Sequence, residues 1–290
     1  MTVMDRRALV LGGGGVTGIA WETGLIAGLG IDLAAADVII GTSAGSLVGT
    51  DIACGQDLEA LYQAQLAPPA PEPAARIGWA FIGRLLWDVH TSRDPKRARA
   101  RIGRWALAVS TMPEADRRNV FEDRLPASVW PSRALKVTAV DARTGEFAVF
   151  DSAGDASLVD AVGASCAVPG LWPPVTIGER RFMDGGMRTV ANADLAHGYE
   201  RVVIVAPVAA GIGFMASPHR QAPGGCCRRS HAVRLNSARQ RRVGGVSSSR
   251  RSSILAGWRM SAAESISARV RGQGKPPSTG VRLIRCAGTG

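Results

Sequence analysis

The residues with the clearest chemical potential in this chain form the pentapeptide Gly41-Thr42-Ser43-Ala44-Gly45. The apolar run before it, Val38-Ile39-Ile40, predicts a buried strand, and the stretch rich in small residues from 44 to 54 predicts a helix. Ser43 would then sit on a sharp strand-to-helix turn that exposes its hydroxyl as a nucleophile. The two flanking glycines let the backbone make such a turn without a side-chain clash. A serine nucleophile indicates acyl transfer, although the pentapeptide alone is a weak signal.

A glycine-rich loop precedes this elbow in the sequence. Ala8-Leu9-Val10-Leu11 predicts an N-terminal strand, and Gly12 to Gly15 follow it, with Gly18 at the start of a predicted helix. Such a loop points several N–H groups at one place in front of a helix dipole, so it can hold a phosphate or stabilise an oxyanion. A dinucleotide site would need an acidic residue at the end of the next strand. Because the serine elbow stands there instead, an oxyanion hole is the better interpretation.

A third element, Asp184-Gly185-Gly186, lies downstream. Val175-Thr176-Ile177 and Arg181-Phe182-Met183 flank Gly178-Glu179, a pattern that predicts a hairpin with Asp184 at the end of its second strand. A carboxylate within roughly 2.6–3.2 Å of the Ser43 hydroxyl could act as its general base. Taken alone, the same tripeptide fits a tight turn with a solvated aspartate better than it fits a catalytic base.

Together, in this order, the three elements resemble the patatin-like phospholipases over about residues 6–208. Gly13-Gly14-Gly15-Val16-Thr17-Gly18 resembles the glycine-rich oxyanion loop of that family, the Ser43 pentapeptide its nucleophile elbow, and Asp184-Gly185-Gly186 its aspartate motif. The stretch before the aspartate, residues 164–170 and 173–175, also resembles the family. One position departs from the pattern: Thr17 stands where the family often has Arg or Lys, which removes a positive charge near the site.

The resemblance implies a catalytic Ser–Asp dyad that acts on lipid or phospholipid acyl esters, without a metal or cofactor. Ser43 would attack the ester carbonyl, and Asp184 would take its proton and later activate water. The oxyanion would be bound by the N–H groups of Gly13, Gly14 and Gly15. The implied fold is an α/β three-layer sandwich around a central, mostly parallel mixed sheet, and strands predicted at about 8–11, 38–40, 136–140 and 202–205 agree with it.

The rival chemistry is a Ser-His-Asp triad of the α/β-hydrolase type. Ser43, Asp184 and His197 follow the chain order that such a triad requires. However, His197 lies where we expect a helix to end before the strand at 201–205, and a histidine there is more often a capping or surface residue. We therefore prefer the dyad.

Charge divides the chain into a body at 6–208 and a basic segment at 213–290. The whole chain carries a formal charge of +11, yet residues 213–290 alone hold 15 Lys and Arg against one acidic residue, Glu264. This segment lacks helical or strand periodicity and is rich in Arg, Ser and Gly, which predicts disorder or a shifted reading frame in a GC-rich gene. A non-catalytic protein with a nucleic-acid-binding tail is the alternative function, but we do not expect nucleic acid as a partner.

The middle of the chain suggests contact with a membrane surface. Residues 76–89 predict a strongly apolar helix, and a basic cluster follows up to Arg104, so 76–104 fits a lid resting on anionic lipid; a buried helix followed by a solvated one is the simpler interpretation. No apolar run reaches the roughly 20 residues of a membrane span, and no signal-peptide pattern opens the sequence. The five cysteines lack metal-ligand spacing. These features predict a cytoplasmic protein, peripheral to the membrane at most.

Overall fold

We analysed a computed structural model of the chain, which describes residues 6–29, 36–66, 83, 94–208, 230–233 and 280–285. Its strands are β1 (Arg7–Leu11), β2 (Val38–Gly41), β3 (Leu135–Asp141), β4 (Phe147–Phe150), β5 (Val175–Ile177), β6 (Arg180–Asp184), β7 (Arg201–Ala206), β8 (Ser230–Val233) and β9 (Gly280–Arg285). Its α-helices are α1 (Gly15–Leu29), α2 (Ala44–Ala53), α3 (Leu58–Leu66), α5 (Pro95–Ala108), α6 (Glu114–Arg124) and α7 (Leu158–Ser165). Two short 3-10 helices, Gly185–Met187 and Ala193–Ala196, follow β6.

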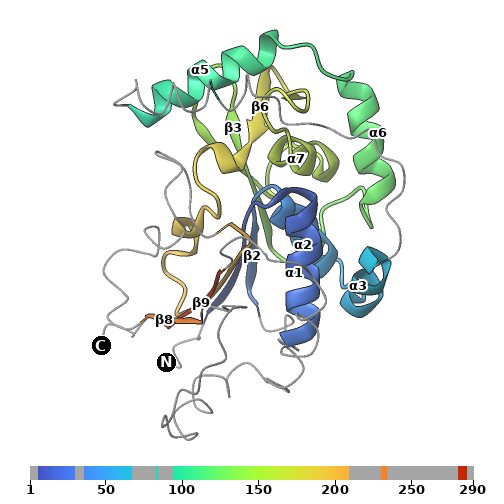
Figure 1. Cartoon of the computed structure of the whole chain (residues 1–290), viewed down its shortest axis with the longest axis vertical. Coiled ribbons are helices and arrows are strands. Elements are labelled where there is room, and N and C mark those ends of the chain that lie inside the picture. The colour runs from blue at the N-terminus through green and yellow to red at the C-terminus, as the bar shows by residue number, and fades with distance from the viewer. Residues whose placement is uncertain are drawn as a thin grey trace, which may run out of the picture.

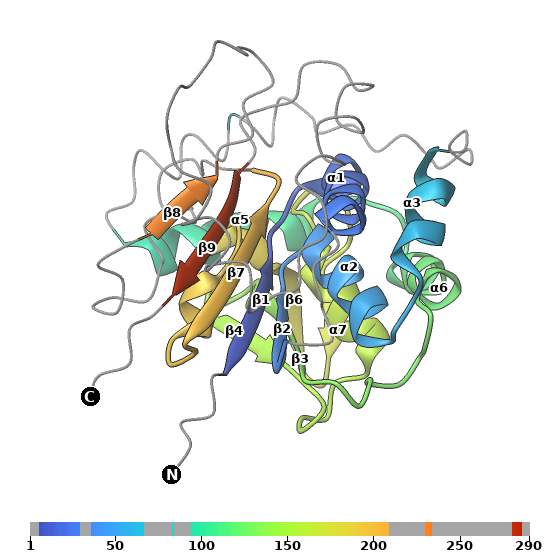
Figure 2. The ribbon, with the colours of Figure 1, turned by 90° about the horizontal axis from the view of Figure 1, so that it is seen from below.

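The described strands form one mixed sheet in the order β5-β6-β3-β2-β1-β7-β9-β8, with β4 paired to β3 (Figures 1 and 2). Its centre is parallel, because β1 pairs in parallel with both β2 and β7, and β2 with β3. The flanking pairs are antiparallel, including the hairpin of β5 and β6. The predicted α/β sandwich around a mixed sheet is confirmed, and its parallel part is these four central strands.

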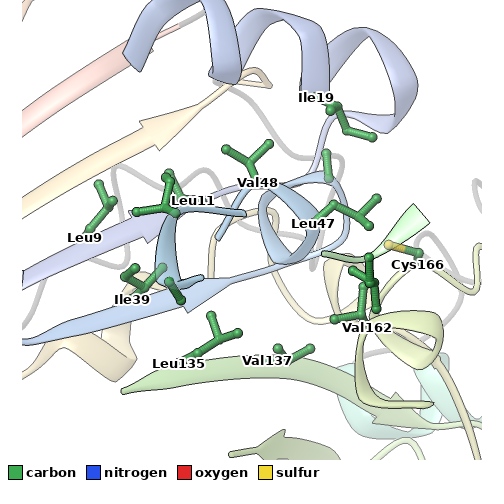
Figure 3. Packing of buried hydrophobic residues seen from close by; sticks show 14 of the residues in the cluster. Leu9, Leu11, Ile19, Ile39, Leu47, Val48, Leu135, Val137, Val162 and Cys166 are labelled. Atoms are coloured by element: carbon green, nitrogen blue, oxygen red, sulfur yellow. The ribbon is translucent and has the colours of Figure 1, made fainter. Parts of the chain in front are cut away.

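Alternation along the central strands separates two apolar layers. Leu9 and Leu11 of β1 pack with α1, α2, α6 and α7 on one face, whereas Ala8 and Val10 pack against the segment around Ala193–Ala196 on the other. Figure 3 shows side chains of β1, β2, β3, α2 and α7 meeting in the first layer. On the second face, α5 contributes Ile102 to a cluster with β3 and β6. Because both faces are covered, the parallel strands β1, β2 and β7 are apolar along most of their length.

The carboxyl ends of β1 and β2 therefore lie side by side. The two strands are parallel and in register, with Leu11 opposite Gly41. The loop that follows β1 and the turn that follows β2 are consequently adjacent at one edge of the sheet. This arrangement brings the glycine loop and the serine elbow together.

Two predicted regions are only partly described. Within 76–104, the structure describes Gly83 and the residues from Asp94 onward, so the predicted apolar helix lies outside the described residues. Asp94 caps α5 by accepting a hydrogen bond from the Lys96 N–H at 2.9 Å.

Within 213–290, the described residues are β8 and β9, and β9 pairs antiparallel with β7 of the body. Those residues form strands where the sequence predicts disorder or a shifted reading frame. In the described part of the chain, no helix is long and apolar enough to cross a membrane.

Candidate active site

Ser43 occupies the turn between β2 and α2, as the pentapeptide predicts. Its backbone has φ 52° and ψ −119°, a conformation that residues other than glycine rarely adopt. The residue is 7 % exposed, so Ser43 is nearly buried. A strained serine on a strand-to-helix turn is typical of a nucleophile elbow.

Backbone contacts explain why this turn needs glycine on both sides. A Cβ atom on Gly41 would lie 2.6 Å from the carbonyl oxygen of Gly45, and one on Gly45 would lie 2.3 Å from the carbonyl oxygen of Leu11. Both distances are shorter than real Cβ contacts, and the obstacles are backbone atoms that cannot turn aside. The elbow is thus packed directly against the end of β1.

Three side chains hold the Ser43 backbone. Its N–H donates a hydrogen bond to Oγ of Ser165 at 2.9 Å. Its carbonyl oxygen accepts bonds from Oγ of Ser46 at 2.6 Å and from Sγ of Cys166 at 3.3 Å. Burial raises the pKa of the Cys166 thiol to about 12, so this group stays neutral and acts as a donor. Ser165 was not predicted as a site residue, although it lies in the stretch that resembles the family.

Asp184 ends β6, as predicted, and its carboxylate lies close enough to the Ser43 side chain for that side chain to lower the pKa of Asp184. Oδ1 also accepts the N–H of Gly186 at 2.6 Å, and the residue is 3 % exposed. Burial raises the pKa of Asp184 to about 6, and the hydrogen bonds from Ser43 and Gly186 oppose this rise. A buried carboxylate that titrates near pH 6 is able to act as a general base at neutral pH.

Gly185 brings the aspartate turn close to β3. A Cβ atom on Gly185 would lie 2.4 Å from the carbonyl oxygen of Thr138 on that strand. At Gly186 the nearest atom to such a Cβ would be Oδ1 of Asp184 itself, at 2.8 Å. The two glycines of the motif therefore have different tasks: the first permits packing on the sheet, and the second leaves room for the carboxylate.

The glycine loop lies next to the nucleophile, because a Cβ atom on Gly13 would be 3.4 Å from Cβ of Ser43. The three predicted oxyanion donors are not equivalent. The Gly13 N–H donates to the carbonyl oxygen of Val190 at 2.7 Å. In contrast, the hydrogen bonds found within the described ranges use neither the Gly14 nor the Gly15 N–H. Both lie at the N-terminus of α1, where the helix dipole favours negative charge.

Two further residues fix this loop. Oε1 of Glu22 on α1 accepts the N–H of Gly12 at 3.0 Å, and Glu22 is fully buried. Burial raises the pKa of Glu22 well above its ordinary value. Gly18 lies close to the chain after β7 and to α2, since a Cβ atom on it would lie 3.3 Å from Cγ of Pro207 and 3.4 Å from Cβ of Ala44. Glu22 carries no sequence pattern that marks it as part of a site.

His197 lies at the amino ends of the parallel strands, whereas Ser43 lies at their carboxyl ends. It is exposed and precedes β7, next to Gly198, whose carbonyl oxygen accepts a bond from Arg6 at 2.6 Å. Arg6 comes directly before β1, and β1, β2 and β7 run parallel. Since Ser43 follows the carboxyl end of β2, the two residues are separated by the length of the central strands. The arrangement does not support a triad with His197. Among the described residues, no group of three or more His, Cys, Asp or Glu side chains is placed to hold a metal ion.

Comparison with known proteins identifies the family. The family model described as patatin-like phospholipase matches residues 9–197, which include all three motifs. The chain belongs to the patatin-like phospholipase family. The matched range ends before the basic C-terminal segment.

Similar solved structures include VipD from Legionella pneumophila, with 14 % identity and a TM-score of 0.36 over 63 % of this chain and 46 % of that one. The type III effector ExoU matches with 22 % identity and a TM-score of 0.29 over 58 % of this chain and 41 % of that one. ExoU in complex with SpcU, from Pseudomonas aeruginosa, matches with 16 % identity and a TM-score of 0.28 over 58 % and 39 %. This chain thus matches less than half the length of each of these structures.

Proposed function

We propose that this protein is a serine acyl hydrolase that cleaves lipid or phospholipid acyl esters with a Ser43–Asp184 dyad. The observation that carries the proposal is that the strained, nearly buried Ser43 interacts with the buried carboxylate of Asp184 and lowers its pKa, against the rise that burial causes. Membership in the patatin-like phospholipase family supports a lipid substrate.

The proposed reaction has two halves. In the first, Ser43 Oγ attacks the ester carbonyl carbon while Asp184 takes its proton, and the leaving alcohol departs with that proton. In the second, Asp184 removes a proton from water, which attacks the acyl-enzyme carbonyl carbon; Asp184 then gives that proton to Ser43 Oγ as the bond to the acyl group breaks and the fatty acid leaves. Each tetrahedral intermediate carries an oxyanion beside the glycine loop. We assign the donors to the N–H groups of Gly14 and Gly15, because the Gly13 N–H is engaged by Val190.

The surroundings of the dyad favour an uncharged ester at the reacting centre. A buried carboxylate repels anionic groups, and the site places the neutral Ser46, Ser165 and Cys166 around the serine. Val16, next to the proposed donors, is 72 % exposed and offers an apolar side chain at the loop. These features suit an acyl chain near the loop, with any charged head group farther away.

The basic helix α5 is our proposed contact with an anionic membrane surface. Its buried residues face the sheet, and its remaining positions carry five basic residues, Lys96, Arg97, Arg99, Arg101 and Arg104. Replacing Arg97, Arg101 and Arg104 by Glu should abolish flotation with vesicles that contain anionic lipid, while vesicles of neutral lipid bind neither form. Equal flotation of both forms on anionic vesicles would remove α5 from the proposal.

Labelling with a fluorophosphonate probe tests the proposed hydrolase directly, because the probe reacts with activated serines. We expect the wild type to be labelled and to hydrolyse p-nitrophenyl esters, and Ser43→Ala to do neither. The matched control is Ser128→Ala, which removes an exposed-loop hydroxyl in another part of the chain and should change nothing. His197→Ala should also retain both activities, whereas its inactivation would restore the triad. A folded wild type that neither labels nor hydrolyses esters would refute the proposed function.

A further inference from the structure

Asn192 is a fully buried residue that belongs to none of the three motifs. It is 0 % exposed and has φ 49° and ψ 39°, the left-handed conformation. It follows the aspartate turn along the chain and precedes the short helix Ala193–Ala196. Asparagine tolerates this conformation better than most residues do, yet glycine would adopt it at lower cost. The side chain must therefore be considered together with the backbone.

The amide group of Asn192 contacts both halves of the site. Nδ2 lies 3.1 Å from Oγ1 of Thr42, the residue directly before Ser43. It lies 3.2 Å from the carbonyl oxygen of Gly185, the residue directly after Asp184. It also lies 3.2 Å from Oγ1 of Thr138 on β3. The carbonyl oxygen of Thr189 lies 3.1 Å from the same nitrogen. One –NH₂ group thus shares its two hydrogens among acceptors on the elbow, the aspartate turn, the central sheet and its own turn.

The other end of the amide is fixed as well. Oδ1 of Asn192 accepts bonds from Oγ1 of Thr189 at 2.8 Å and from Nη1 of Arg188 at 3.0 Å. Arg188 is in turn held by two bonds to Asp194, at 2.9 and 2.7 Å. Because Arg188 can only donate, it requires the oxygen of the amide to face it and directs the –NH₂ group toward the elbow and the aspartate turn.

A second hydrogen bond closes the same cluster. Oγ1 of Thr42 and Oγ1 of Thr138 lie 2.8 Å apart, and Oγ1 of Thr138 is 3.3 Å from the carbonyl oxygen of Gly41. All of these groups are buried. A change in the position of the aspartate turn relative to the elbow would break several bonds at once, so the cluster opposes such a movement.

We propose that Asn192 is a positioning residue that sets the placement of Asp184 against Ser43 by joining Thr42, Thr138 and Gly185. The inference rests on the proposed function, since it concerns the geometry of the Ser43–Asp184 dyad. Displacement of a catalytic group by about 1 Å can cost roughly 100-fold in rate. The amide of Asn192 therefore acts on the reaction through its two neighbours and without contact to the substrate.

Two substitutions separate the amide from the backbone conformation. Asn192→Gly keeps the left-handed backbone and removes the amide, while Asn192→Asp keeps the shape and removes both N–H donors. We expect each to slow fluorophosphonate labelling of Ser43 and to lower kcat by about 10- to 100-fold, with KM for a short-chain ester changed less than about threefold. A purely conformational role predicts wild-type labelling by Asn192→Gly, and that result would overturn the inference.

Trp130→Phe is the matched control for stability. It removes a half-buried hydrogen bond, from Nε1 of Trp130 to the carbonyl oxygen of Ala156 at 2.8 Å, that lies outside the cluster. We expect it to lower Tm without slowing the labelling of Ser43. If Trp130→Phe slows labelling as much as the Asn192 variants at an equal loss of Tm, the effect of Asn192 is one of stability and the inference fails.

Thr138→Val tests the same cluster without altering residue 192. It keeps the shape of the side chain and removes one hydroxyl, and we expect labelling about 10-fold slower. Combined with Asn192→Gly, its effect should be less than the product of the two single effects, because both remove parts of one cluster. If neither Asn192 variant folds, wild-type labelling by a folded Thr138→Val overturns the inference. A labelled wild type with fully labelled variants refutes the inference alone, whereas an unlabelled, inactive wild type refutes the proposed function.

Discussion

The serine elbow and the aspartate turn are held in place by different means. At the elbow, backbone packs against backbone: a Cβ atom on Gly45 would lie 2.3 Å from the carbonyl oxygen of Leu11. The aspartate turn also packs on the sheet, where a Cβ atom on Gly185 would lie 2.4 Å from the carbonyl oxygen of Thr138. In addition, the amide of Asn192 bonds to the carbonyl oxygen of Gly185, and the carboxylate of Asp184 accepts the Gly186 N–H. Substitution of the elbow glycines should therefore act on the fold, whereas substitution of Gly186, which meets only the side chain of Asp184, should act on the chemistry.

The two regions also differ in charge. The groups that hold the Ser43 backbone are two hydroxyls and a thiol, all neutral. The turn contributes a carboxylate that is buried beside them, and its burial raises the pKa of Asp184 to about 6. A buried charge costs folding free energy. The free energy of unfolding is thus lowered at the turn by a buried charge, whereas at the elbow the constraint is close backbone packing.

Replacement of the carboxylate should give the largest effect on activity. We expect Asp184→Asn to lower kcat/KM by about 1000-fold, because no base remains to take the proton of Ser43. The raised pKa of Asp184 means that folding disfavours its charged form, so the carboxylate lowers stability as pH rises from about 4 to 6. The variant should therefore be at least as stable as the wild type at pH 7.5. Ester hydrolysis and thermal unfolding measure both effects.

The conservative variant Asp184→Glu serves as the control for charge. It keeps a carboxylate but moves it by one methylene, so we expect activity between that of the wild type and Asp184→Asn. An Asp184→Asn variant with near-wild-type activity would show that another group is the base. If Asp184→Asn is inactive because it unfolds, then the aspartate turn, like the elbow, is required for the fold.

A methyl group at the elbow should act chiefly on stability. In Gly45→Ala the new Cβ would collide with the backbone of Leu11, and we expect a loss of about 3 kcal/mol, or roughly 10 °C in Tm. Thermal unfolding followed by circular dichroism measures the loss. Gly28→Ala is the matched control, since nothing lies within 4 Å of a Cβ atom there. Equal Tm values for the two variants would contradict the steric account of the elbow.

The same methyl group at the aspartate turn should act chiefly on activity. A Cβ atom on Gly186 would meet Oδ1 of Asp184 at 2.8 Å, and the carboxylate can swing away to relieve the contact. We expect Gly186→Ala to remain folded and to lose about 100-fold in kcat, because the base is displaced. Enzyme kinetics and Tm of the same preparation decide the matter. A large drop in Tm with unchanged activity per folded molecule would remove the contrast between the two regions.

The sequence predicts the elbow well because its signals are local. A β-branched run, a serine between two glycines and a stretch of small residues are all visible within about twenty positions, and the structure has β2, Ser43 and α2 there. The hairpin that delivers Asp184 is likewise local, with β5 and β6 separated by the turn at Gly178. Short-range patterns of this kind survive folding unchanged.

The residues that complete the site could not be predicted in this way. Ser165 lies 122 positions from Ser43, and Asn192 lies 150 positions from Thr42. A single serine or asparagine has no periodicity, and its role arises only when the sheet brings distant segments together. For the same reason, no sequence pattern predicts that the carbonyl oxygen of Val190 accepts the Gly13 N–H. The predicted helix at 76–89 and most of the basic C-terminal segment lie outside the described residues, so those expectations stay predictions.

The pH dependence of activity should follow the carboxylate of the turn. Asp184 must be deprotonated to accept the proton of Ser43, and its pKa of about 6 places the change between pH 5 and 7. We expect kcat/KM to be constant above pH 7 and to fall about tenfold for each pH unit below 6. A histidine base would give a similar curve, so the profile must be repeated with His197→Ala. An unchanged curve supports Asp184, and loss of the acid limb would support the histidine.

The smallest expected effect concerns Glu22, which supports the glycine loop beside the elbow. Oε1 accepts the Gly12 N–H, whereas Oε2 has no hydrogen-bond partner within the described part of the chain. Burial raises the pKa of Glu22, so the unfolded chain releases this proton at a lower pH than the folded chain does. The stability of the wild type must then fall as pH rises above the ordinary value of a glutamate.

Glu22→Gln removes this titration and keeps an oxygen that can accept the Gly12 N–H. We expect the variant to gain Tm relative to the wild type at pH 8. The gain should shrink as pH falls toward and below 4.5, where the unfolded chain also binds the proton that Glu22 holds in the folded chain. Glu179→Gln, on the exposed hairpin turn, is the control and should give a difference that does not change with pH. A Glu22→Gln variant that loses the same Tm at both pH values would show that the glycine loop requires the carboxylate itself. In that case the elbow side of the site would also depend on a buried charge, and the contrast with the aspartate turn would be one of degree.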